Sequence, residues 1–402
     1  MSNNADIKKV SQSLAEPEWL LSWRGKRFAE AESLPQSIKH GIAITALFPE
    51  SAPDYASHAE YHVDASKGLE IYTWKEAVTQ EEIVPVLKGL MESPFFPIAT
   101  DHFRALGQAL FASGLVVYVQ PNLAPDDTFI TERLTLDTMV PADSASDVIV
   151  VIAKEGAKLE LVCNTSGGND GSVFSRTLIV VTERDAEVRI TEGAALVSGA
   201  MQMKCTRAIV AGNSKVLWRE LFSGEALLST INESLLIGAN ARVSVLQGVV
   251  GEGHGIHDIE VSARHLADDT HSQIRTAGVA SDTSRTLYRG LVDMKEGVHR
   301  VVGTQEGTFL VLSPKAKVDA IPALDIASND VTCAHKLSIS HIREGDMFYP
   351  KLRGFSDDES RSLFLEGHFG QVFEGEANAD LMAQVTEKLQ ALQMPASDTK
   401  KS

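Results

Sequence analysis

The stretch Asp185-Ala-Glu-Val-Arg-Ile190 sets a turn residue, a small residue, a charged residue and alternating apolar residues in a row. The same order recurs in Gly156-Ala-Lys-Leu-Glu-Leu161, Asn213-Ser-Lys-Val-Leu-Trp218 and Asn240-Ala-Arg-Val-Ser-Val245. The small residues lie at 157, 186, 214 and 241, so the copies are 29, 28 and 27 residues apart. A repeat of this length without a helical unit predicts a stacked β-solenoid, in which each turn of chain buries its apolar face against the next.

The repeat extends over most of the chain. Two further steps of 28 residues from position 241 reach Gly297, and Ala316-Lys-Val-Asp-Ala320 is a shorter echo. From Leu115 onward, short β-type runs such as Leu-Val-Val-Tyr-Val alternate with turn residues, and helical periodicity is nearly absent. A β-sandwich is the structural alternative, but its turn signals recur about every 8–12 residues without a longer period. The sequence therefore favours a mainly β protein built on a solenoid.

Helical patterns flank this β-rich body. We expect three parts: an N-terminal helical region (1–114), a solenoid core (115–342) and a C-terminal helical region (343–402) with a disordered tail. The N-terminal part predicts helices after Glu16 and Thr79 and near Thr100, with one short strand within 34–73. In the C-terminal part, Ser356-Asp-Asp-Glu359 predicts a capping box, and residues 378–392 have helical spacing.

Composition limits the function. The chain of 402 residues has 37 Lys and Arg against 54 Asp and Glu, a formal charge of −17. Such a surface repels nucleic acid and anionic membranes, so neither is an expected partner. Because we find no long apolar span and no secretory signal, we expect a cytoplasmic protein. The three cysteines lie far apart without a Cys-x-x-Cys pair, which indicates reduced thiols, with Cys163 and Cys205 as core residues.

Cys333 and His335 form the only Cys-x-His pair and share one face of a predicted strand. A thiolate and an imidazole in this arrangement could be two ligands of a soft transition metal, a nucleophile with its base, or a packing pair. Two ligands do not close a metal site, so further ligands would have to come from elsewhere in the fold or from a partner chain. The remaining histidines of interest are predicted to be scattered on the surface or in turns: His254, His257, His265 and His271.

An alternative function is that of a carbohydrate-active β-helix enzyme, a lyase or a hydrolase. Asp268, Asp269 and Asp282 are its candidate acids. Sugar-binding sites usually need exposed aromatic side chains, and only 6% of this chain is aromatic. The sequence therefore favours this interpretation less.

Several motifs resemble the SufB/SufD family. The run Leu324-Asp-Ile-Ala-Ser-Asn-Asp-Val-Thr-Cys-Ala-His335, followed by Phe348-Tyr349 and Arg353-Gly354, is similar to the C-terminal signature of that family. Further similar segments are Glu16-Pro-Glu-Trp-Leu20, Ser284-Arg-Thr-Leu-Tyr-Arg-Gly290, Gln305 and Leu312-Ser313. Cys-x-His before a helical tail resembles SufD more than SufB. Four residues differ from the family pattern: Asp325, Lys336, Pro350 and Leu352.

The resemblance implies a right-handed parallel β-helix between helical ends. It also implies a non-catalytic SufD-like scaffold subunit for iron–sulfur cluster assembly, which pairs with a SufB-like protein along the β-helices. A nascent iron–sulfur cluster would be shared at that interface, with His335 as this chain's ligand and Cys333 beside it.

The same resemblance implies that a SufC-like ABC ATPase docks on the C-terminal region. The candidate docking residues are Phe348, Tyr349, Arg353 and Gly354, together with the helix after Ser356. Packing of Phe348 on the last turn of the solenoid is an equally good interpretation of that residue. The chain has no ATP site of its own in this scheme, and its glycine-rich segment 165–171 lacks the Lys-Ser/Thr ending of a P-loop.

Overall fold

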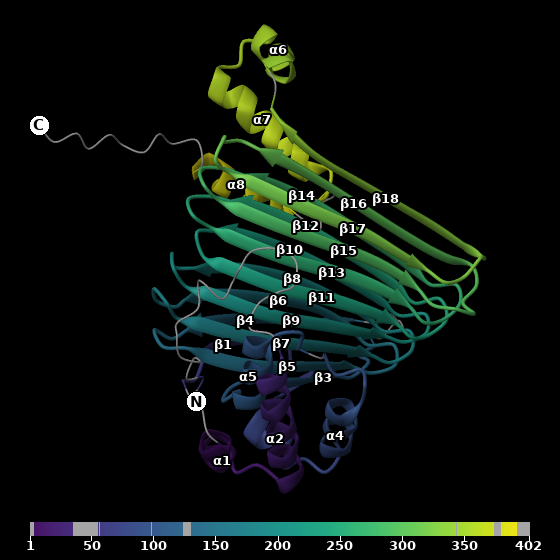
Figure 1. Ribbon diagram of the computed structural model, residues 1–402. Helices are drawn as coiled ribbons and strands as arrows, with labels where there is room; N and C mark the ends of the chain where they lie inside the picture. The colour runs from purple at the N-terminus through teal and green to yellow at the C-terminus, as the bar shows by residue number, and fades with distance from the viewer. Residues whose placement is uncertain are drawn as a thin grey trace, which may run out of the picture.

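The computed structural model describes residues 4–34, 55, 57–97, 99–123, 130–342, 344–373 and 379–391. Within these ranges the chain forms a parallel β-solenoid with helices at both ends, which confirms the predicted mainly β fold (Figure 1). The solenoid has two sheets of nine strands each. From β3 onward, successive strands along the chain alternate between the two sheets, so every full turn of the solenoid contributes one strand to each.

The first sheet, here sheet I, contains in spatial order β1 (Glu60–Ala65), β4 (Thr131–Val140), β6 (Lys158–Gly167), β8 (Glu187–Leu196), β10 (Lys215–Gly224), β12 (Arg242–Gly251), β14 (His271–Ala280), β16 (Val301–Val311) and β18 (Val331–His341). Sheet II contains β17 (Lys317–Ile326), β15 (Arg285–Met294), β13 (Ile256–His265), β11 (Leu227–Leu236), β9 (Met201–Val210), β7 (Val173–Thr182), β5 (Ala145–Ala153), β3 (Leu115–Val119) and β2 (Leu69–Thr73).

The strand register confirms the repeat for the middle of the solenoid. Lys158 pairs with Glu187, Glu187 with Lys215 and Lys215 with Arg242, which are steps of 29, 28 and 27 residues. The turn residues before these strands have φ of 61° at Asp185, 58° at Asn213 and 61° at Asn240. Asp and Asn tolerate this left-handed conformation better than most residues, which explains their recurrence.

Two details of the repeat were predicted wrongly. Arg242 pairs with His271 and His271 with Val302, steps of 29 and 31 residues, so the copy after Thr270 begins at Val301 rather than at Gly297. The turn before β16 is longer than the others, which shifts the period. The echo at Ala316 precedes β17, which belongs to sheet II, whereas the other copies precede strands of sheet I.

The core lies between the two sheets. Inward side chains of neighbouring strands stack in columns, because the paired residues of parallel strands point to the same side. One such column in sheet I consists of Leu161, Ile190, Trp218, Val245 and Ile274, all of them buried. The apolar alternation in the sequence thus becomes a continuous apolar interior.

The strand direction reverses at the N-terminal end of the solenoid. β1 and β2 run antiparallel to β4 and β3, respectively, and so end the parallel stack. In the described part of the chain, five helices lie at this end: α1 (Asn4–Ser13), α2 (Glu18–Ser33), α3 (Trp74–Ala77), α4 (Val84–Glu92) and α5 (His102–Leu110). The sequence predicted one strand here where the structure has two. The run Leu69–Thr73 alternates weakly, and its pairing with β3 decides its conformation.

The C-terminal helices are α6 (Glu344–Leu352), α7 (Asp357–Gly370) and α8 (Ala379–Ala391). The predicted capping box is confirmed, since the backbone N–H of Glu359 donates to Ser356 Oγ over 3.3 Å. Leu365 and Phe369 of α7 and Leu381 and Val385 of α8 are buried in a second apolar cluster on sheet I. The predicted disordered tail from Pro395 lies outside the described residues. Among the helices described, none is long and apolar enough to cross a membrane.

Candidate functional site

The last turn of the solenoid, formed by β17 and β18, is called the open rung below. Each of the two strands has a neighbouring strand on one side only, β15 and β16, respectively. No residue of β17 or β18 is fully buried, whereas inner strands such as β5 are buried throughout. The backbone groups on the free side of an edge strand are a template for another strand.

The inward side chains of the open rung are apolar and only partly covered. They pack against the core between the sheets and form its exposed end: Val318, Ala320 and Leu324 from β17, and Val331, Cys333 and Leu337 from β18. Ile321 and Ile339 add exposed apolar surface, with 47% and 44% of their area accessible. An apolar end of this kind is typical of a surface that a partner covers.

Cys333 and His335 both lie on β18, and the register places them in line with inward-facing residues. Cys333 pairs with Gly303 and His335 with Gln305, which is 3% exposed. The Cys333 thiol is half-buried, and this burial raises its pKa. A hydrogen bond from the backbone N–H of Ala334 lowers the pKa and offsets part of the increase. His335 is exposed. The two side chains therefore stand at the mouth of the solenoid interior.

The columns that lead to these two residues change character near the open rung. Toward His335, five apolar residues from Leu161 to Ile274 are followed by Gln305. Toward Cys333, the apolar residues Leu159, Val188, Val216 and Val243 are followed by Ser272 and Gly303. In these two columns the residues become small or polar only in the last two turns before the Cys-x-His pair.

Cys333 and His335 by themselves do not make a closed metal site. Among the described residues, no cluster of three or more His, Cys, Asp or Glu side chains could hold a metal ion. A thiolate and an imidazole suit a soft transition metal or an iron–sulfur cluster, but such centres usually have four ligands. The donor set fits a cluster only if a second chain adds ligands across the open rung.

Two residues that differ from the family signature have local roles. Lys336 Nζ lies 3.1 Å from Glu306 Oε1 on the neighbouring strand, and its side chain is 73% exposed. Lys336 directly follows His335 on β18, and successive side chains of a strand point to opposite faces, so Lys336 points away from the interior. Pro350 lies inside α6, the helix that carries Phe348 and Tyr349. Neither residue blocks the mouth of the solenoid.

The candidate docking residues lie on and just after α6. Phe348 and Tyr349 are each 62% exposed and Leu352 is 68% exposed, so Phe348 does not pack on the last turn of the solenoid. The Arg353 guanidinium lies over the Tyr349 ring at 4.7 Å and donates to its hydroxyl. Gly354 has φ of 91° and ends the helix, with its N–H donating to Lys351 O.

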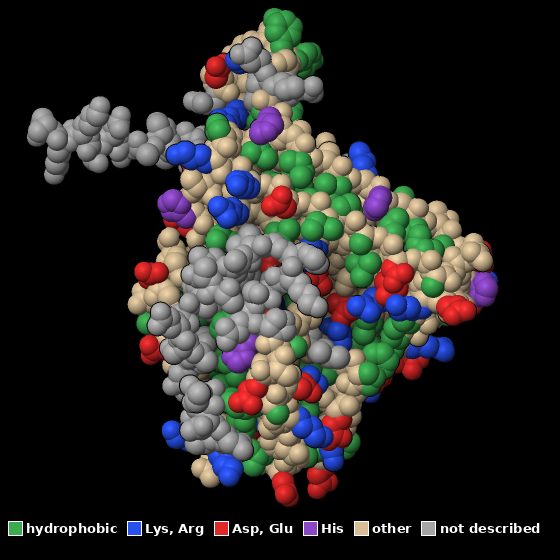
Figure 2. Space-filling model, in the orientation of Figure 1, with side chains coloured by type: hydrophobic (Ala, Val, Ile, Leu, Met, Phe, Trp, Pro, Cys, Tyr) green, Lys and Arg blue, Asp and Glu red, His purple; other side chains and the backbone are tan. Residues whose placement is uncertain are grey.

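These residues belong to a larger apolar surface, here called the α6 patch: Phe348, Tyr349, Leu352, Phe355 and Leu363. In Figure 1, α6 stands beyond the solenoid, and Figure 2 shows hydrophobic side chains gathered at that tip. Sequence reasoning did not assign Leu352 and Phe355 to this surface, whereas Leu363 lies on the helix after Ser356 that it included. The spacing of Phe348, Leu352 and Phe355 at i, i+4 and i+7 was the available signal.

Two histidines predicted on the surface or in turns are buried. His257 and His265 lie on β13 and are 0% exposed, and burial lowers the pKa of each to about 4. His265 contacts Thr270 and Ser272 through its two ring nitrogens, both at 2.8 Å. The prediction failed because an imidazole with polar neighbours fits an inward column as well as a turn. Cys163 and Cys205 are buried core residues, as predicted.

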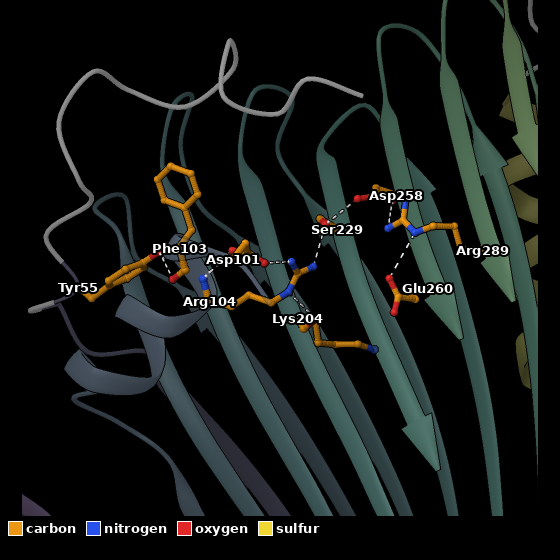
Figure 3. A network of polar contacts seen from close by, with 9 residues as sticks. All are labelled: Tyr55, Asp101, Phe103, Arg104, Lys204, Ser229, Asp258, Glu260 and Arg289. Atoms are coloured by element: carbon orange, nitrogen blue, oxygen red, sulfur yellow. Dashed lines mark hydrogen bonds and ion pairs between the residues drawn. The ribbon is translucent and has the colours of Figure 1, made fainter. Parts of the chain in front are cut away.

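The outer face of sheet II carries a buried charge network beneath α5 (Figure 3). Arg104 of α5 pairs with Asp101 and donates to Ser229 Oγ over 2.8 Å. Ser229 donates to Asp258 over 3.2 Å, and Asp258 in turn pairs with Arg289 over 2.7 Å. The bond from Arg104 to Ser229 links α5 to sheet II. Each buried charge of the network has an opposite charge or a hydroxyl beside it, which offsets the cost of its burial.

A cavity of about 370 Å³ adjoins this network, and its charged side chains are mutually paired. Glu233 pairs with Arg207 and with Arg264, and Glu260 with Arg289.

The acids proposed for a carbohydrate enzyme also form ion pairs or hydrogen bonds. Asp269 pairs with Arg300 over 2.6 Å, and Asp268 accepts from the His299 backbone. Asp282 accepts from the Gly253 backbone over 3.0 Å. None of these pairings favours acid–base catalysis.

The comparisons with known proteins agree with this geometry. The model of the SUF system FeS cluster assembly, SufBD core domain family matches residues 138–368, more than half of the chain. The chain belongs to the SufBD family. The matched range includes most of the solenoid, the open rung, α6 and all but the last two residues of α7. Membership supports a role in iron–sulfur cluster assembly.

Curated relatives are similar over most of their length. An iron–sulfur cluster assembly SufBD family protein of Staphylococcus saprophyticus is 24% identical, with 90% of this chain and 86% of the relative covered. A relative of the same description from Staphylococcus aureus strain USA300 has the same identity and coverage. A third, from Staphylococcus epidermidis, is 23% identical over 67% of this chain and 58% of its own length.

Proposed function

We propose that this SufBD family chain is a non-catalytic, SufD-like scaffold subunit for iron–sulfur cluster assembly in the cytoplasm. The observation that carries the proposal is the open rung, where a half-buried thiol and an exposed imidazole stand at an uncovered apolar end. The nascent cluster is the cargo of this site. His335 is the ligand that we assign to it, with Cys333 as the neighbouring thiol.

The incompleteness of the ligand set supports a two-chain site. With two candidate donors in the described part of the chain, a cluster would need donors from a second chain. The free sides of β17 and β18 would pair with edge strands of a SufB-like protein, and the apolar mouth would be covered in the same step. Strand pairing and burial together would align the ligands of the two chains.

The test is a His335→Ala variant in the assembled complex. We expect cluster assembly to fall at least tenfold, measured by the absorbance of the cluster and by transfer to an apo acceptor protein. Cys333→Ala should have a smaller effect, since the half-buried Cys333 is assigned as the neighbouring thiol and His335 as the ligand.

His341→Ala is the matched control, because it removes an imidazole from the end of the same strand. His341 contacts the Val311 carbonyl over 3.0 Å rather than the mouth of the solenoid. Normal cluster yield from His335→Ala in a complex shown to be intact would contradict the ligand assignment. A loss of yield in His341→Ala of the same size would show that the strand, and not His335, is what matters.

The α6 patch is the proposed docking surface for a SufC-like ABC ATPase. Three neighbouring apolar side chains more than half exposed are unusual unless a partner covers them. Tyr349 and Arg353 are residue types enriched at the centres of interfaces, and their stacking fixes both side chains before binding. Gly354 allows the turn between α6 and α7, which sets the direction of the patch.

Leu352→Asp tests the docking surface. We expect a loss of ATPase capture of at least tenfold in a pull-down with purified ATPase, while pairing with the SufB-like chain is unchanged. Val197→Asp is the control, because Val197 is 42% exposed and lies in a turn of the solenoid. Unchanged ATPase binding by Leu352→Asp and by a Phe348→Asp variant would refute the assignment.

A further inference from the structure

A chain of buried polar side chains runs through the solenoid interior toward His335. It begins at Glu220 on β10, whose carboxylate pairs with Lys204 over 2.8 Å. It continues through Gln247, Thr276 and Tyr288 to Gln305, and all of these side chains are at most 3% exposed. The proposed function uses none of them, and further polar side chains, among them Glu192 and Asn232, are buried beside them in the same interior.

The direction of the hydrogen bonds is set at the carboxylate. An ionised carboxylate only accepts, so Gln247 Nε2 donates to Glu220 Oε2 over 2.8 Å. The carbonyl oxygen of Gln247 must then face Thr276, whose hydroxyl donates to it over 3.0 Å. The amide orientation of Gln247 is therefore not free to reverse.

The second part of the interior network joins two other side chains. Thr276, which donates to Gln247, lies beside Tyr288. The Tyr288 oxygen accepts from Gln305 Nε2, which lies 3.3 Å away. The Gln305 amide thus directs its nitrogen toward Tyr288 and its oxygen elsewhere.

Gln305 ends the chain with an unused acceptor. Its Oε1 is buried, and no group in the described part of the chain donates to it. A buried carbonyl without a donor is unfavourable, so this position calls for one. Gly290 leaves the space that the Gln305 amide occupies, because a Cβ at this position would overlap it.

His335 is the register partner of Gln305 on the adjacent strand. Adjacent strands are about 4.8 Å apart, and both side chains have the same inward parity, so the imidazole is within reach of the amide oxygen. We propose that Gln305 is a positioning residue for His335, accepting a hydrogen bond from one imidazole nitrogen so that the other bears the lone pair for the metal. The inference rests on the proposed role of His335.

The consequence is a fixed tautomer. A metal-binding imidazole commonly donates its other N–H to a fixed acceptor, which orients the ring. Here the fixed acceptor is the buried Gln305 amide, whose nitrogen is held by the Tyr288 hydroxyl. The change from an apolar to a polar column at Gln305 thereby has a function.

The test is ¹⁵N NMR of the isolated chain with labelled histidine, with the His335 signals assigned by their loss in His335→Ala. In the wild type we expect His335 to show one predominant tautomer at neutral pH. Gln305→Leu should shift the two ring nitrogens toward averaged values. Gln273→Leu is the matched control, since Gln273 is exposed on the neighbouring strand β14 and should change nothing.

Tyr288→Phe is the second variant, in case Gln305→Leu does not fold. It keeps the ring but frees the Gln305 amide to turn over, so the tautomer preference should again be lost. An unchanged His335 tautomer in both folded variants would overturn the proposal. In the assembled complex, Gln305→Leu should lower Co²⁺ affinity about tenfold, as losses of such supporting hydrogen bonds do.

The two proposals can fail separately. If His335→Ala leaves cluster assembly normal but Gln305→Leu changes the tautomer, the hydrogen bond is real and the ligand role is wrong. If His335→Ala stops assembly while the tautomer is the same in all variants, His335 is the ligand and Gln305 does not position it.

Discussion

The two ends of the solenoid are built in opposite ways. At the N-terminal end, β1 and β2 turn antiparallel and so end the parallel stack. At the C-terminal end, β17 and β18 keep the parallel direction and have no strand beyond them. An edge strand is a template for pairing with another strand, and a solenoid commonly ends in an atypical turn. Because the strand direction reverses only at the N-terminal end, the C-terminal end is the one at which we expect another chain.

The charged and titratable groups follow the same division. In the interior of the solenoid body they are buried and paired, as in the contacts of Lys204 with Glu192 and Glu220. In the open rung, His335 and Lys336 are exposed, and Cys333 is half-buried. In the proposed function, the open rung forms one half of an interface. Three measurements would break or sharpen this contrast.

The largest difference is expected from one substitution made in both places. Leu161→Ala in the body removes a side chain that is 1% exposed and should lower the free energy of unfolding by about 2–5 kcal/mol. Leu337→Ala in the open rung removes a half-buried side chain and should cost less than about 1 kcal/mol in the isolated chain. Denaturant unfolding measures both. Equal costs would mean that the open rung is already as well packed as the body.

The second difference concerns pH. Burial lowers the pKa of His257 and His265 to about 4, below the ordinary value of 6.5, so the unfolded chain takes up protons that the folded chain does not. The free energy of unfolding is therefore highest above about pH 6.5 and decreases as the pH falls toward 4. At pH 5 the decrease is about 1–2 kcal/mol for each of the two histidines.

Unfolding curves at pH 7 and pH 5 check this sign. His257→Leu should remove about half of the pH dependence due to the two residues. A stability that is independent of pH over this range would contradict the burial of the two imidazoles.

The smallest expected effect is on association at the open rung. Ile339→Asp places a charge on exposed apolar surface of β18 and should weaken binding of a SufB-like partner about tenfold, or about 1.4 kcal/mol. Folding of the isolated chain should be unaffected. Val197→Asp, a similar exposed position in a solenoid turn, should leave partner binding unchanged. Equal binding by both variants would place the partner elsewhere.

The sequence by itself determined the solenoid and its flanking helices. Alternating apolar residues and left-handed turn residues such as Asp185 and Asn213 are local features, and each repeat states them again. The capping box at Ser356 is equally local. The same residues were enough to indicate the family, through the signature around Cys333 and His335.

Only the tertiary structure decided what these residues face. Strand pairing placed His335 over Gln305 and left β17 and β18 without a neighbour, and neither fact is encoded in spacing alone. It also buried His257 and His265 and exposed Phe348, because burial depends on which elements meet and not on residue type. The sequence identified the Cys-x-His pair. The stacking of eighteen strands placed that pair at an open end.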